Sequence, residues 1–92
     1  MMEVREASRA LGVSEDELVE KSVKAYLENE LRRIKAEMNS IFTRYDVRSF
    51  LELDEKITSG ALNETDSFED YTRLDYLDSQ REKIEKVLGG DS

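Results

Sequence analysis

The sequence predicts an all-α protein, a helical bundle built on one long central helix. Its apolar residues recur at intervals of three and four, and no stretch shows the alternation of a half-buried strand. Proline is absent from the 92 residues, and the four glycines fall at three places where helices would end. Several acidic residues precede a basic residue by four positions, which is a stabilising spacing on a helix surface.

The first expected helix covers about residues 3–11 and ends at Gly12. Ser14 and Glu17 then form a capping box, in which a hydroxyl and a carboxylate satisfy free N–H groups at a helix start. No helix-breaking residue follows before about residue 44, so the second helix is expected to be about thirty residues long.

Ser49 and Glu52 form a second capping box, which predicts a third helix over residues 50–58. The stretch "SGALNETDS" is rich in turn-forming residues and predicts a loop. A fourth helix follows and is expected to reach about residue 88, before "GGDS" frays. Two pairs are spaced to cap its start: Asp66 with Glu69, or Asn63 with Asp66.

The second helix is too long to be covered by its own chain alone. About thirty residues span roughly 45 Å, whereas a compact domain of this size is about 32 Å across. We therefore expect a homodimer or a hetero-complex, with a monomeric bundle as the alternative. In a homodimer, a flanking row would meet its symmetry mate: Leu18, Val19, Val23 and Tyr26. The helix also carries a coiled-coil seam, which could pack on the fourth helix or on a second copy: Leu27, Leu31, Ile34, Met38, Ile41 and Tyr45.

The chain is long enough for a single helical domain, residues 1–92. Its N-terminal part, residues 1–45, would hold the short helix and the long dimerisation helix, and residues 46–92 would form an acidic helical part. The net charge of −8 lies mostly in residues 46–78, where ten acidic and three basic residues leave −7. This acidic segment should repel a phosphate backbone and attract a basic protein surface.

Several classes of function are disfavoured by composition. The chain has no cysteine and no histidine, so it lacks the commonest general base and the commonest transition-metal ligands. The densest carboxylate cluster, "ETDSFED", lacks the order of a calcium loop. We expect no enzymatic activity, no metal and no cofactor. No apolar run is long enough for a membrane span, and the N-terminus does not resemble a signal peptide, so we expect a cytoplasmic protein.

The stretch "EASRALGVSEDELVEKSVKAYLENEL" resembles the two helices of the ribbon-helix-helix family of bacterial and archaeal repressors and antitoxins. The resemblance covers about residues 5–31 and implies dimerisation through the second helix. That family reads DNA with a strand before the first helix, and "MMEV" is too short for such a strand. Residues 45–88, beginning "YDVRSFLELDEKI", resemble the C-terminal part of small archaeal and bacterial antitoxin-like proteins.

The preferred hypothesis is a small acidic binding protein, antitoxin-like, that neutralises a basic protein toxin such as a nuclease or a nucleotidyltransferase. Tyr76 stands off the apolar row of the fourth helix and is the best candidate for an exposed contact. The alternatives are a helix-turn-helix-like DNA-binding regulator and a purely structural helical subunit, although nucleic-acid binding is disfavoured by the charge. The residues expected to bind the partner are Phe50, Asp66, Phe68, Glu69, Asp70, Tyr71, Asp75 and Tyr76.

Overall fold

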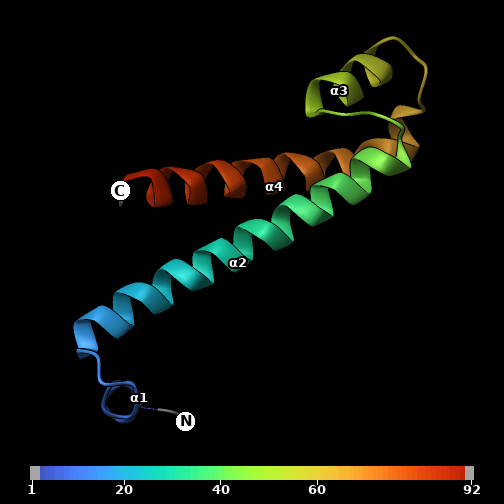
Figure 1. The fold of residues 1–92 in the computed structure, drawn as a ribbon. Coiled ribbons are helices and arrows are strands. Elements are labelled where there is room, and N and C mark those ends of the chain that lie inside the picture. Colours follow the sequence, from blue (N-terminus) through green and yellow to red (C-terminus); the bar gives the residue numbers. More distant parts are fainter. Residues whose placement is uncertain (1–2, 91–92) are drawn as a thin grey trace. The chain divides into compact units, whose positions relative to one another are not determined.

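The computed structural model of the chain describes residues 3–90 and contains helices and no strand in that range (Figure 1). The prediction of an all-α fold with one long helix is confirmed. None of the described helices is both long and apolar enough to cross a bilayer. The four helices are α1 (Val4–Leu11), α2 (Glu15–Arg44), α3 (Phe50–Thr58) and α4 (Glu64–Gly90).

The helices belong to two compact units that divide within α2. The N-terminal unit ends at Glu30 and holds α1 and the first half of α2. The C-terminal unit begins at Leu31 and holds the second half of α2 together with α3 and α4. The acidic segment 46–78 lies entirely within the C-terminal unit.

The turn between α1 and α2 has the caps that the sequence predicts. Gly12 adopts a left-handed conformation with φ of 69°. The Val13 N–H donates to the carbonyl of Ser8 at 3.1 Å, which closes a Schellman motif at the end of α1. The Ser14 hydroxyl accepts a hydrogen bond from the Glu17 N–H at 3.0 Å. These contacts confirm the predicted helix boundary.

The end of α2 uses a feature that the sequence did not indicate. Asp46 takes the left-handed position that glycine usually fills, with φ of 54°. The N–H of the buried Val47 donates to the carbonyl of Phe42 at 2.9 Å, so this turn is also a Schellman motif. Aspartate tolerates this conformation better than most residues because its short side chain can bond locally.

The starts of α3 and α4 are capped by side chains. The Ser49 hydroxyl accepts from the Glu52 N–H at 3.2 Å, and the Glu52 carboxylate accepts from the Arg48 N–H at 2.6 Å. For α4 the alternative with Asn63 is confirmed, because its side-chain oxygen accepts from the Thr65 N–H at 2.9 Å. The expected end of α4 is wrong by two residues: neither glycine before the C-terminus takes a positive φ, and the helix continues through both.

The apolar core lies in the C-terminal unit, where α4 runs back along the second half of α2 and α3 packs on α4 (Figure 1). Three residues of the predicted seam, Ile34, Met38 and Ile41, pack into this core within the chain. Leu31 and Tyr45 are half-buried in the same unit, while Leu27 is half-buried in the N-terminal unit. The buried apolar residues are Ile34, Met38, Ile41, Val47, Leu53, Leu74 and Leu77.

The N-terminal unit has no comparable core. Among residues 3–30 the buried side chain is that of Ser8, whose hydroxyl donates to the Arg5 carbonyl at 3.0 Å. In the row expected to face a second copy, Val19, Val23 and Tyr26 are exposed and Leu18 is half-buried. Homodimerisation stays a prediction. The large apolar side chains exposed in this unit are Val4, Leu11, Val19, Val23 and Tyr26.

Candidate functional site

The structure sorts the eight residues expected to bind a partner into two groups. Half-buried in the C-terminal unit are Phe50, Asp70 and Tyr71. The rings of Phe50 and Tyr71 lie 4.9 Å apart, and both pack against the core. The other five residues lie exposed on α4: Asp66, Phe68, Glu69, Asp75 and Tyr76.

Phe68 and Tyr76 stand out among these five because they are large, apolar and open to solvent. Phe68 is 63% exposed and Tyr76 is 54% exposed. At about 100° per residue, both rings and the carboxylates of Glu69 and Asp75 fall within roughly 120° of one side of α4. We call these four residues the aromatic–acidic face. A shallow groove of about 570 Å³ runs along it, lined by Phe68, Glu69, Asp70, Thr72, Arg73 and Tyr76.

Arg73 holds part of this face in place. Its guanidinium makes two hydrogen bonds to Glu37 of α2, at 2.5 and 3.1 Å, and lies 5.5 Å from the centre of the Tyr76 ring. The hydrogen bond from Arg73 lowers the pKa of Glu37, so the carboxylate stays ionised and keeps the arginine in position. The Tyr76 ring therefore lies against a guanidinium group that Glu37 holds in position, and this contact favours one orientation of the ring.

Asp70 has a different role from the exposed acids. Its Oδ2 accepts hydrogen bonds from Arg44 Nη1 and from the Tyr45 hydroxyl, both at 2.6 Å. The hydrogen bond from Tyr45, followed by that from Arg44, lowers the pKa of Asp70. The same contact raises the pKa of the Tyr45 hydroxyl, because the neutral phenol is the hydrogen-bond donor. Asp70 thus ties α4 to the end of α2, and its charge is largely compensated within the chain.

The acid unfolding of the protein is expected to depend on Asp70. Because folding lowers the pKa of this carboxyl below its ordinary value of 3.8, the ionised form stabilises the fold at neutral pH, and the contribution is lost as the pH falls through the lowered pKa. Asp70→Asn should lose about 1 kcal/mol at neutral pH and decline less steeply than wild type between about pH 5 and 2. Urea unfolding across this range measures both effects. The control Asp75→Asn removes the same charge from an exposed position of the same helix, and its free energy of unfolding at neutral pH should stay within about 0.5 kcal/mol of wild type.

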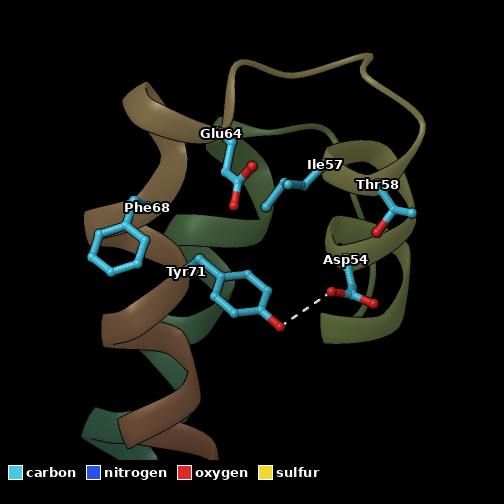
Figure 2. A pocket seen from close by; sticks show the side chains of 6 residues that line it. All are labelled: Asp54, Ile57, Thr58, Glu64, Phe68 and Tyr71. Carbon is cyan, nitrogen blue, oxygen red and sulfur yellow. Dashed lines mark hydrogen bonds between the residues drawn. The ribbon is translucent and has the colours of Figure 1, made fainter.

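A second hollow, of about 330 Å³, lies between α3 and α4 (Figure 2). The Tyr71 hydroxyl donates to Asp54 Oδ1 at 3.1 Å across it. Burial, and then this hydrogen bond, raise the pKa of Tyr71. Sequence reasoning singled out only the two aromatic residues here; the others carry no motif and meet only through tertiary packing. The hollow is lined by Asp54, Ile57, Thr58, Glu64, Phe68 and Tyr71.

The groove on α4 and the hollow between α3 and α4 both combine carboxylates with aromatic rings. This arrangement suits cationic side chains, which pair with carboxylates and stack on aromatic rings. Within residues 3–90, no three metal-ligating side chains come together where they could hold an ion.

Comparisons with known proteins relate the chain to an archaeal protein. A family model described as "Uncharacterized protein MJ0235 family" matches residues 1–89. The chain is 33% identical over 73 residues to the protein MJ0235 of Methanocaldococcus jannaschii, an alignment that covers 79% of this chain and 89% of the relative. No solved structure matches.

Proposed function

The chain belongs to the MJ0235 family, and for this member we propose a non-enzymatic binding function, in which the chain captures a basic protein partner and neutralises it as an antitoxin neutralises a toxin. The partner docks on the aromatic–acidic face of α4. The aromatic rings anchor it, and the surrounding carboxylates attract it.

The observation that carries this proposal is the exposure of Phe68 and Tyr76 beside the exposed carboxylates of Glu69 and Asp75. Aromatic residues are enriched among those that dominate binding energy at protein interfaces. The rings lie in the segment that holds a net charge of −7, which is more than the capping of two helices requires. Charge of this density steers a basic partner toward the surface and disfavours acidic ones.

The most suitable partner class is a protein that itself binds nucleic acid, such as a nuclease or a nucleotidyltransferase. Such proteins carry lysine and arginine where they contact phosphates. A helix face that presents carboxylates at regular spacing offers these side chains an alternative set of anions. Occupation of the basic surface would keep the nucleic acid away and so inhibit the partner.

The test starts from the basic protein that co-purifies with the tagged chain from its native cells, and measures binding kinetics for purified components. Tyr76→Ala should raise the dissociation rate about 10- to 100-fold, because a central aromatic anchor is lost. Neutralising Asp66, Glu69 and Asp75 together should mainly slow association and flatten its dependence on salt, because these exposed acids act at a distance. Asp70 is left unchanged in this variant because its hydrogen bonds connect α4 to the end of α2.

Val87→Ala is the matched control for the aromatic anchor. Val87 lies on the same helix and is 59% exposed, but it is outside the acidic segment, so its loss should leave the kinetics unchanged. A partner that binds all variants equally well would contradict the proposal. A mobility shift with nonspecific duplex DNA at low salt addresses the regulator alternative: an acidic inhibitor should give no shift, and a DNA-binding regulator should give one.

A further inference from the structure

We propose that the hollow between α3 and α4 is a slot for one arginine side chain of the basic partner. This inference rests on the proposed function and adds a specific chemical requirement to it: the partner presents a guanidinium group to this slot while the aromatic–acidic face of α4 binds the surrounding surface. Phe68 belongs to both surfaces, so the two are continuous.

Two carboxylates from different helices lie at the slot. Asp54 belongs to α3, and Glu64 is the first residue of α4. Figure 2 shows Glu64 above the hollow and Asp54 across it, with the Tyr71 ring reaching from α4 toward α3. The hydroxyl of Tyr71 donates to Asp54 Oδ1 and so orients that carboxylate.

The part of the chain that the structure describes supplies no cation to this slot. In the described residues 3–90, neither Asp54 nor Glu64 forms an ion pair with a basic side chain. The nearby Lys56 instead donates to the backbone carbonyls of Tyr45 and Asp46, at 3.0 and 3.2 Å. Two negative charges therefore face the same hollow without an internal counter-charge, which is the electrostatic complement of a cation from outside.

The walls favour arginine over a bare cation. Ile57, Phe68 and Tyr71 offer apolar surface for an aliphatic stem, and an aromatic ring can stack on a planar guanidinium. A guanidinium has five N–H donors in one plane and can pair with more than one acceptor, whereas an ammonium is a point charge. The volume of about 330 Å³ is at the lower end for ligand pockets, which suits a single side chain.

The test uses Nα-acetylarginine N-methylamide as the probe and follows the full chain by NMR. The probe should shift the resonances of Ile57, Thr58 and Tyr71 in a saturable way, with a dissociation constant in the millimolar range. The citrulline analogue has nearly the same shape without the charge and should bind at least tenfold more weakly. Glu64→Gln should weaken binding of the arginine probe about fivefold, since it removes one charge-assisted contact at an exposed helix start.

Glu55→Gln is the matched control, because Glu55 is an exposed carboxylate of α3 that does not line the slot. This variant has the same change in net charge and should bind the probe like wild type. Absence of saturable shifts, equal binding of the citrulline analogue, or equal weakening by Glu55→Gln would each overturn the arginine slot.

The arginine slot and the proposed function can fail independently, and the two experiments distinguish these outcomes. If the arginine probe fails to bind while the basic partner still responds to Tyr76→Ala and to salt, the slot is wrong and the binding function stands. If the probe saturates the slot while the partner is indifferent to the aromatic–acidic face, the proposed function fails on its own test.

Discussion

Replacement of Leu53 by alanine is expected to lower the free energy of unfolding of the C-terminal unit by about 3 kcal/mol. Leu53 lies in the core cluster and is 0% exposed, so the truncation removes apolar contacts and leaves a cavity that the surrounding helices fill only in part. For a domain of this size the loss corresponds to a fall in melting temperature of about 12 to 24 °C. Thermal and urea unfolding followed by circular dichroism measure it.

Leu51→Ala is the control for this experiment. Leu51 lies two residues away on the same helix and is 64% exposed, so the same truncation should change stability by no more than about 0.5 kcal/mol. Equal losses for the two variants would show that α3 does not pack on the core as described.

Val23→Asp is expected to separate a homodimer into monomers. The N-terminal unit buries no apolar side chain of its own in residues 3–30, and Val23, at 53% exposure, belongs to the apolar row of α2 expected to meet a second copy. A carboxylate placed in that interface would be buried without a partner, at a cost of several kcal/mol, and the dimer dissociation constant should rise at least 100-fold. Sedimentation equilibrium over a range of concentrations measures the change.

Lys24→Gln makes the same change in net charge on the same turn and serves as the control. Lys24 is exposed and lies at least about 100° around the helix from every residue of the row, so its variant should remain dimeric. The melting of the C-terminal unit should be unchanged in both variants, since its core contains neither residue. A wild-type chain that sediments as a monomer at every concentration would contradict the dimer.

The positions of the aromatic residues at the candidate site could be predicted from the sequence only in part. Phe50, Phe68, Tyr71 and Tyr76 were equivalent candidates by composition. Position relative to the Leu74 and Leu77 row was enough to place Tyr76 outside, whereas the exposure of Phe68 and the mutual packing of Phe50 and Tyr71 depend on where α3 meets α4.

By itself, the sequence determined the all-α class, the helix starts at Ser14 and Ser49, and the concentration of charge in residues 46–78. These features depend on contacts within about four residues of the chain, where helical geometry alone decides which groups meet. Asp70 shows what only the tertiary structure decided: its bonds to Arg44 and Tyr45 span more than twenty residues, and they tie α4 to the end of α2.

The packing of the apolar seam of α2 was also decided by the tertiary structure and not by the sequence pattern alone. Its spacing predicted an apolar stripe that needed a partner, and a stripe of this kind is satisfied equally by another helix of the chain or by a second copy. The tertiary structure placed Ile34, Met38 and Ile41 of the seam in the chain's own core. It left exposed three residues of the separate N-terminal row: Val19, Val23 and Tyr26. Periodicity specifies which residues share a face, but only the loops and the returning helix determine which part of that face is covered.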